Sequence, residues 1–98
     1  MGFKVVFTSP AIDDLRGITE YVSRDNPDSA EKLGLQIIAK TEMLSEFPLI
    51  GRSVPEFKVT TIREIIHGAL RVVYRVREEA NTIEVLRVWH AARGVPQL

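Results

Sequence analysis

The sequence contains no cysteine, which excludes a disulfide framework and any metal site built on thiolate ligands. Its only two histidines, His67 and His90, lie far apart, so a zinc site would need carboxylates from distant segments. The motifs of phosphate-binding loops, dinucleotide-binding folds and serine hydrolases are absent as well. We therefore expect a protein that uses neither a metal nor a cofactor.

Long apolar stretches are also missing. No run approaches the roughly 20 apolar residues that a membrane-spanning helix needs. The start of the chain, MGFKVVFTSP, has a lysine and an early proline where a secretory signal has a long apolar region. Because the lack of cysteine also suits a reducing compartment, we expect the protein in the cytoplasm.

With 98 residues, of which 45% are hydrophobic, the chain is expected to form a single domain over residues 1–98 around one core. Its formal net charge is zero, but the charges are unevenly distributed. Residues 1–50 hold five basic and eight acidic side chains, a net of −3, whereas residues 51–98 hold eight basic and five acidic ones, a net of +3. Seven of those eight are arginines, which suit two-pronged contacts with phosphate or carboxylate. The C-terminal half therefore either meets an anionic partner or presents a solvent face laced with ion pairs.

Two helices are expected after a first strand at residues 3–7, where FKVVF is short, β-branched and aromatic. Ser9 and Asn26 are each followed by a proline, a pattern typical of the residue that caps the start of a helix. Apolar residues recur at steps of three and four after both positions, as in helices that bury one face. Pro48 and Gly51 end the second helix, and the short connection predicts an antiparallel helical hairpin.

After the second helix the pattern changes to that of strands. Residues 51–59 have the look of a loop, and strands are expected at 60–66, 69–77 and 81–90, joined by short turns. The predicted order is β-α-α-β-β-β. This is an α+β fold in which a mainly antiparallel sheet packs on the N-terminal helical hairpin.

Alternation sorts the side chains of these strands between two faces of the sheet. In the strand at 69–77, four residues should meet the helices: Leu70, Val72, Tyr74 and Val76. The opposite face is expected to be uncovered and to gather arginines with two valines between them: Arg71, Arg75 and Arg87, with Arg63 as a further candidate, and Val73 and Val85. Such arginines need acidic neighbours or an external anion, so this face is a candidate docking surface. Trp89 falls on the face of Arg87, whereas His90 falls on the other face unless the strand ends or bulges before it.

The sequence is compatible with one reaction, the cleavage of RNA without a metal. RNA can be cut without a metal when its own 2′-hydroxyl attacks the adjacent phosphate, provided that a base, an acid and cations are in place. The candidates for these roles are Glu56, Arg71 and His90. Each has a structural alternative: Glu56 can pair with a nearby arginine, and His90 can have a structural role. Trp89 can pack against arginine stems instead of stacking on a base.

Several segments together resemble the RelE/ParE superfamily of toxins from type II toxin–antitoxin operons, often described as plasmid stabilisation proteins. In chain order they are SPAIDDLRGITEYVSRDNPDSA, LSEFPLIGRSVPEF, IREIIHGALRVVYRV and IEVLRVWHAARG. The resemblance covers roughly residues 3–93. It is closer to the ParE-like branch than to the ribosome-dependent nucleases.

The resemblance implies a small bacterial protein that a cognate antitoxin holds inactive with a segment that folds on binding. In the nuclease branch, Glu56, Arg71 and His90 fall at plausible counterparts of the cleavage residues. However, this chain has Ala91 where such nucleases often place a tyrosine after the histidine, and its sheet has no lysine pair for gripping RNA. ParE-like members generally lack that catalytic set and are associated with inhibition of DNA gyrase.

The resulting hypothesis is a ParE-like toxin that inhibits DNA gyrase by contact and has no chemistry of its own. Its expected binding residues, for target or antitoxin, are Arg63, Arg71, Arg75, Arg87 and Trp89. One alternative is a RelE-like endonuclease that cleaves ribosome-bound mRNA with Arg71, His90 and Glu56. Another is a non-toxic binding module on the same fold. The expected partners are a cognate antitoxin, in a toxin–antitoxin hetero-oligomer, and either gyrase or the ribosome with its mRNA.

Overall fold

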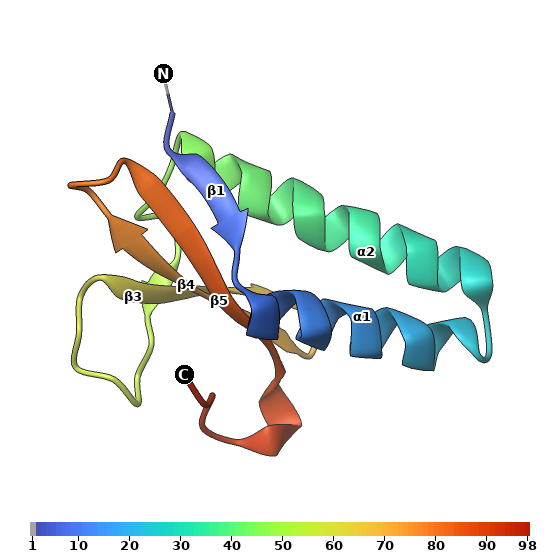
Figure 1. The fold of residues 1–98 in the computed structure, drawn as a ribbon. Helices are drawn as coiled ribbons and strands as arrows, with labels where there is room; N and C mark the ends of the chain where they lie inside the picture. The colour runs from blue at the N-terminus through green and yellow to red at the C-terminus, as the bar shows by residue number, and fades with distance from the viewer. Residues whose placement is uncertain (1) are drawn as a thin grey trace.

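The computed structural model describes residues 2–98, which form two helices and a sheet of five strands (Figure 1). The elements follow in the order β1 (Lys4–Phe7), α1 (Ser9–Ser23), α2 (Pro27–Glu42), β2 (Arg52–Ser53), β3 (Ile62–His67), β4 (Leu70–Arg77) and β5 (Thr82–His90). Short 3-10 helices lie at Met43–Ser45 and Ala91–Arg93. The predicted α+β fold is confirmed. The two-residue strand β2, in the segment expected to be a loop, was missed.

The spatial order of the strands is β1-β5-β4-β3-β2, so the first and last strands of the chain are neighbours. β1 runs parallel to β5, and the other neighbouring pairs are antiparallel. The two helices run side by side in opposite directions on one face of the sheet (Figure 1). Neither helix among residues 2–98 is long and apolar enough to cross a membrane.

The start of α1 lies one residue earlier than predicted. Thr8, and not Ser9, is the capping residue, because its hydroxyl oxygen accepts a hydrogen bond from the Ala11 N–H at 3.3 Å. The same hydroxyl donates to the carbonyls of Val85 and Leu86, which ties the end of β1 to β5. Asn26 caps α2 as predicted, with its side-chain oxygen accepting from the Ser29 N–H at 3.1 Å.

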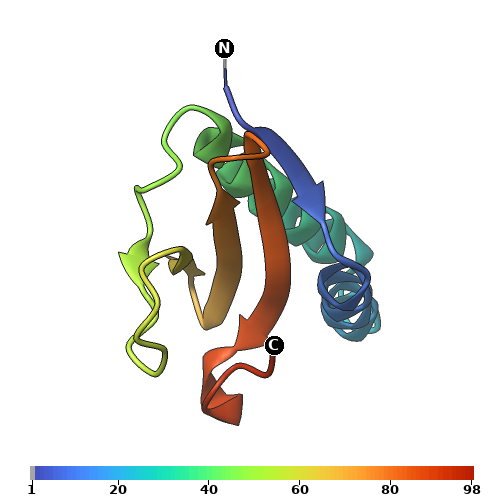
Figure 2. The same ribbon diagram turned by 60° about the vertical axis from the view of Figure 1, so that its left-hand side comes forward.

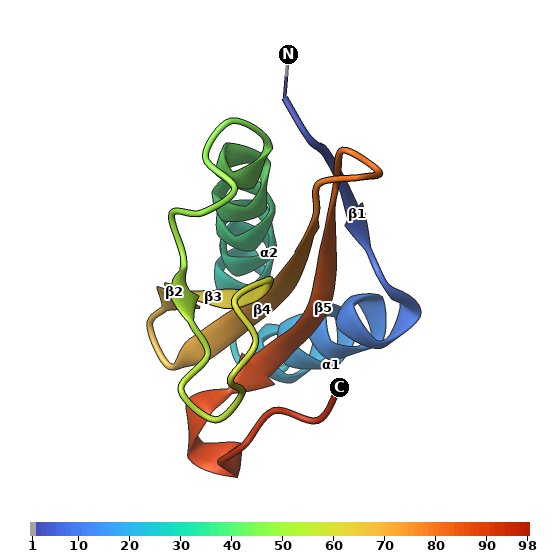
Figure 3. The ribbon, with the colours of Figure 1, turned by 90° about the vertical axis from the view of Figure 1, so that its left-hand side faces the viewer.

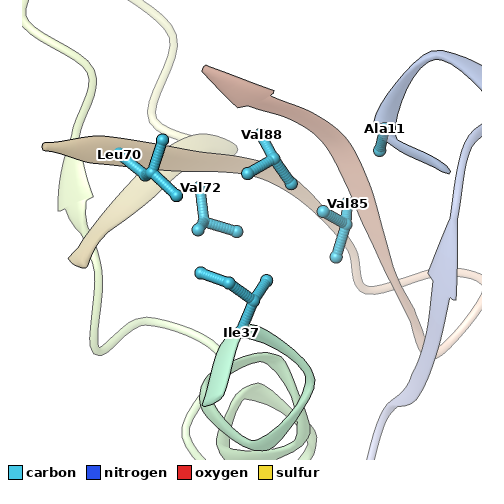
Figure 4. Close-up of a cluster of buried hydrophobic side chains, with 6 residues drawn as sticks. All are labelled: Ala11, Ile37, Leu70, Val72, Val85 and Val88. Atoms are coloured by element: carbon cyan, nitrogen blue, oxygen red, sulfur yellow. The ribbon is translucent and has the colours of Figure 1, made fainter. Parts of the chain in front are cut away.

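The apolar core lies between the sheet and the helices. Its central cluster consists of Ala11, Ile37, Leu70, Val72, Val85 and Val88 (Figure 4). A second cluster adjoins it near the start of β1: Leu44, Tyr74, Val76 and Ile83. The predicted inward positions of β4 are therefore confirmed. The stripe on the helices is narrower than expected, because Ile12 and Ile38 remain 44% and 41% exposed.

A bulge in β5 changes which of its side chains share a face. Val73 pairs with Arg87 and Tyr74 pairs with Val85, so Leu86 is an extra residue in the ladder. As a result, Val85 faces the helices while Arg87 and Trp89 face outward. The prediction that Val85 lies among the outward arginines was wrong, because simple alternation does not hold across a bulge.

The predicted place of Arg63 was also wrong. The register pairs Arg63 with Tyr74, whose side chain lies in the helix-side core, so Arg63 is on the opposite face from Arg71. Its guanidinium Nη1 donates to the Gly51 carbonyl at 2.9 Å. Arg63 therefore does not join the other arginines.

The outward face of the sheet is partly covered, contrary to the prediction that it is uncovered. The loop at 54–61 and the C-terminal residues lie against it, on the side away from the helices (Figures 2 and 3). Val54 and Val73 are almost completely buried in one cluster with Ile62, and Phe57 packs against it. The apolar side chains of the loop account for this cover, because they remove their own surface and that of Val73 from water.

Candidate functional site

Arg71 lies at the centre of a buried ion-pair network on the outward face. Its guanidinium makes a two-pronged contact with Glu56, through Nη1–Oε2 at 2.9 Å and Nη2–Oε1 at 2.7 Å. Its Nε donates to Glu64 Oε1 at 2.6 Å, and its Nη1 also lies 3.3 Å from the Gly94 carbonyl oxygen. Only 9% of the Arg71 side chain is exposed, so these protein groups replace the water and anions that it would otherwise bind.

Glu64 links this centre to the short strand β2. Its side chain is fully buried, and its second oxygen accepts from Arg52 Nε at 2.7 Å. Glu64 was not singled out from the sequence. A signal was available, since an antiparallel hairpin of β3 and β4 places Glu64 and Arg71 diagonally on one face. One buried carboxylate thus holds two arginines.

The ion pairs shift the titration of their members. The hydrogen bond from Arg71 is the main reason that the pKa of Glu56 falls from 4.5 to about 2. Glu56 and Glu64 in turn raise the pKa of the Arg71 guanidinium. Glu56 is therefore ionised at every physiological pH, and the structural alternative for this residue, pairing with a nearby arginine, is confirmed.

Arg87 is neutralised by an acidic residue of α1. Its guanidinium meets Asp14 with two hydrogen bonds, Nε–Oδ2 at 2.7 Å and Nη2–Oδ1 at 2.8 Å. This contact raises the pKa of Arg87, and the Val88 N–H donates to the same carboxylate. Asp14 lies in the first half of α1. Its position opposite the β5 bulge follows from the way that α1 crosses the sheet, which the sequence pattern does not reveal.

Trp89 is buried between arginines and the end of the chain. The guanidinium carbons of Arg87 and Arg93 lie 4.8 and 3.9 Å from the centroid of its ring. The indole N–H donates to the Gly94 carbonyl at 3.2 Å, and 2% of the residue is exposed. Trp89 therefore packs against arginines, as the structural alternative had it, although through their guanidinium groups and not their aliphatic stems. The prediction that Trp89 binds a target or antitoxin was wrong for this conformation, because the side chain is buried.

The outer arginines of β4 share one acidic partner, and they are more exposed than Arg71. Arg77 Nε donates to Glu84 at 2.7 Å, and Arg75 lies 3.7 Å from the same carboxylate. Their side chains are 42% and 34% exposed. Because of these acidic neighbours, the arginines predicted to need a counterion do not need an external one.

His90 lies apart from the network. It pairs with Leu70 in the sheet, on the opposite face from Trp89, and its Nδ1 accepts from the Ala92 N–H at 3.2 Å. The residue is exposed and lines a groove together with His67 and Tyr21. The structure therefore brings Glu56 and Arg71 together but leaves His90 on the other face.

The three residues predicted for RNA cleavage, Glu56, Arg71 and His90, do not lie around one common position in the described structure. Glu56 and Arg71 are bound to each other in an ion pair, and His90 lies on the other face of the sheet. Nor does any group of three or more histidine, aspartate or glutamate side chains among residues 2–98 have the arrangement of a metal site. The outward face instead carries the buried ion pairs of Arg71 and, at its edge, the less buried arginines Arg75 and Arg77.

The chain is similar to known toxins over nearly its whole length. Residues 5–95 match the family described as ParE toxin of type II toxin–antitoxin system, parDE. The chain is 30% identical over 91 residues to Toxin RelE2 of Caulobacter vibrioides, an alignment that covers 92% of this chain and 97% of that protein.

Solved structures share the fold at lower identity. A chain of the chromosomal ParDE toxin–antitoxin system from P. aeruginosa superposes with a TM-score of 0.73 at 23% identity, covering 90% of this chain and 95% of the other. A chain of the RelBE2 toxin–antitoxin complex from Mycobacterium tuberculosis gives a TM-score of 0.67 at 24% identity, covering 92% and 99%. Fold, family match and relative agree with the resemblance seen in the sequence, and the chain belongs to the RelE/ParE superfamily as a ParE-family toxin of type II toxin–antitoxin systems.

Proposed function

We propose that this toxin acts by binding its target, DNA gyrase, without cutting RNA, and that a cognate antitoxin neutralises it in the bacterial cytoplasm. The observation that supports binding without RNA cleavage is the ion pair between Glu56 and Arg71. His90 lies on the opposite face of the sheet from this pair. The family match to a ParE toxin supports the choice of gyrase, through the association of that branch with this enzyme.

The ion-pair network is poorly suited to cleavage of RNA. A general base works best with a pKa near the operating pH, whereas the pKa of Glu56 is lowered to about 2 by its contact with Arg71. The donors of Arg71 already point at Glu56, Glu64 and the Gly94 carbonyl. To hold a phosphate, Arg71 would have to leave two carboxylates and lose buried ion pairs.

A protein partner is supported by the fold neighbours. The structures from P. aeruginosa and M. tuberculosis are toxin–antitoxin systems, and a further one is E. coli RelE bound to a peptide of the antitoxin RelB, with a TM-score of 0.61. We infer the same class of partner for this chain, with the partly exposed arginines Arg75 and Arg77 of the outward face available to it or to the target.

The test begins with growth. Expression of the chain alone should arrest bacterial growth, and co-expression of the small gene next to it should restore growth. Purified chain should then inhibit supercoiling by purified gyrase and leave ribosome-bound mRNA intact. Normal growth without the partner would indicate a non-toxic binding module. Intact supercoiling together with cleaved mRNA would establish the nuclease instead.

Two substitutions distinguish inhibition by binding from cleavage of RNA. Glu56→Gln and His90→Ala each remove a group that the nuclease mechanism needs, and both side chains are at the surface of the fold. The proposal expects both variants to retain growth arrest and inhibition of gyrase. Glu31→Ala, at an exposed position of α2 away from the outward face, is the matched control for expression and folding. Loss of toxicity in the first two variants but not in the control would contradict the proposal.

A further inference from the structure

β1 is an edge strand with a free side. Its backbone meets β5 through alternate residues: the N–H groups of Lys4 and Thr8 donate to the Asn81 and Val85 carbonyls, both at 3.0 Å. Alternation then turns the N–H and C=O groups of Val5 and Phe7 to the other side, where the sheet formed by residues 2–98 has no further strand. Such an edge is a template for pairing with another strand.

The free part of this edge is short and symmetric about Val6. On one side it is closed at Phe3, whose N–H donates to the Ser45 carbonyl at 2.8 Å. On the other side it ends where α1 begins at Ser9. An incoming strand can therefore use only the outward-pointing groups of Val5 and Phe7, which lie one residue before and one residue after Val6.

Apolar hollows adjoin both ends of the edge. The hollow at the Phe7 end is lined by Ile12, Leu15 and Ile38, and the hollow at the Val5 end is lined by Phe3, Met43 and Phe47. Four of these side chains keep 41 to 57% of their surface exposed: Ile12, Ile38, Met43 and Phe47. Covering them would remove apolar surface from water at both ends of the strand.

The two hollows carry opposite charges. Arg16 lines the one at the Phe7 end, and it lies 3.6 Å from Asp13 in an exposed ion pair. Glu42 and Glu46 line the one at the Val5 end. A strand that fits this edge must therefore present acidic groups at one end and basic groups at the other.

We propose that the occupant is β1 of a second copy of this chain, paired antiparallel about a two-fold axis through Val6. In this register Val5 of each copy exchanges both backbone hydrogen bonds with Phe7 of the other. The antiparallel direction brings the Arg16 end of each copy to the Glu42 and Glu46 end of the other. The surface thus complements itself at both ends, as a closed two-fold dimer requires, and the sheet continues through both copies.

This inference does not depend on the proposed target, because its test is the oligomeric state of the full chain. Sedimentation equilibrium should show a concentration-dependent dimer. Val5→Pro should convert it to a monomer with an unchanged circular dichroism spectrum, because the lost N–H points away from β5 and proline is tolerated at such an edge. Val6→Thr, which alters an outward side chain and keeps the edge groups, is the matched control and should leave the dimer intact.

Charge reversal provides a second, independent test. Arg16→Glu alone, or Glu42→Arg with Glu46→Arg, should raise the dimer dissociation constant by roughly tenfold or more, since repulsion replaces attraction at both ends. The triple variant should restore the affinity of the original chain. A monomer at all concentrations would overturn the inference and leave the edge to a segment of another protein. A dimer that survives both Val5→Pro and the single reversals would overturn it as well.

Discussion

The two faces of the sheet are buried by different means. Toward the helices, apolar side chains such as Ile37, Val72 and Val85 fill the space between the layers. On the outward face, Glu64 and Arg71 are buried under a loop and the chain end, where each satisfies the other. The stability of the first face therefore depends on how well side-chain volumes fill the space, whereas that of the second depends on each buried charge keeping its partner.

Glu64→Ala should have the largest effect. It leaves Arg71 and Arg52 without a shared carboxylate, and removal of one partner of a buried pair costs about 3–5 kcal/mol. Ile37→Ala, on the helix side, should cost a similar 2–5 kcal/mol or so for a different reason, the cavity that it leaves. Urea unfolding monitored by circular dichroism gives both values. Glu79→Ala, whose carboxylate is 73% exposed, should change stability by less than about 1 kcal/mol. Equal stabilities of the Glu64 and Glu79 variants would refute the idea that the outward network is a structural element.

Gly51→Ala tests the packing at a position where the chain touches both β3 and β4. A Cβ atom at this position would lie 2.6 Å from both the Glu64 carbonyl oxygen and the Tyr74 hydroxyl. That hydroxyl accepts from the Gly51 N–H at 3.0 Å and donates to the Pro48 carbonyl at 2.8 Å, so it has little room to move. We expect a loss of roughly 1–3 kcal/mol in the free energy of unfolding.

Gly17→Ala is the matched control for Gly51→Ala. Apart from its chain neighbours and the backbone of its own helix, no described atom lies within 4 Å of a Cβ built at Gly17. Because glycine costs about 0.5–1 kcal/mol relative to alanine inside a helix, this variant should be more stable than the original chain. Thermal melting of the two variants side by side tests the sign. A neutral Gly51→Ala would show that the turn can shift away from β3 and β4.

Lowering the pH should weaken the ion pairs on the outward face of the sheet before it affects the apolar core between the sheet and the helices. The pKa of Glu56 is lowered from 4.5 to about 2 in the folded chain, so its contribution to stability is fully present above pH 4.5 and is lost as the pH falls toward 2. Glu56→Gln should remove that part of the pH dependence. The measurement is the unfolding free energy of both proteins at several pH values across this window. If the unfolding free energies of the two proteins changed with pH in the same way, the ion pair between Glu56 and Arg71 would not contribute to stability.

His90→Ala should have the smallest effect. The side chain is exposed, and its recorded hydrogen bond is to the Ala92 N–H, so we expect a loss of about 0.5–1 kcal/mol. Its neighbour Trp89 lies on the other face and is 2% exposed, so Trp89→Ala should cost about 3–5 kcal/mol. Denaturation of the two variants compares adjacent residues on opposite faces. A His90 variant as unstable as the Trp89 variant would mean that His90 supports more than a local turn.

Much of the fold could be predicted from local patterns. The cap at Asn26, the inward positions of β4 and the order of the elements depend on residues that are close in the chain, where propensity and alternation apply directly. The outward face could not be predicted in the same way. The bulge at Leu86 moved Val85 to the other face, and the hairpin register did the same to Arg63. A shift of one residue in a strand reverses every later side chain, and local patterns do not report it.

For the candidate site, too, some features could be predicted from the sequence and others could not. The types of residue were evident early, including Glu56 beside an arginine-rich strand and Trp89 among arginines. Their partners were not, because Asp14 and Glu64 reach Arg87 and Arg71 across distances set by how α1 and β3 pack on the sheet. The sequence by itself determined the family, the layers and the supply of arginines, since these follow from composition and period. Only the tertiary structure decided that most of those arginines are already paired within the chain. Because burial makes an unpaired charge costly, the fold brings carboxylates to the buried guanidinium of Arg71 and to the largely buried guanidinium of Arg87.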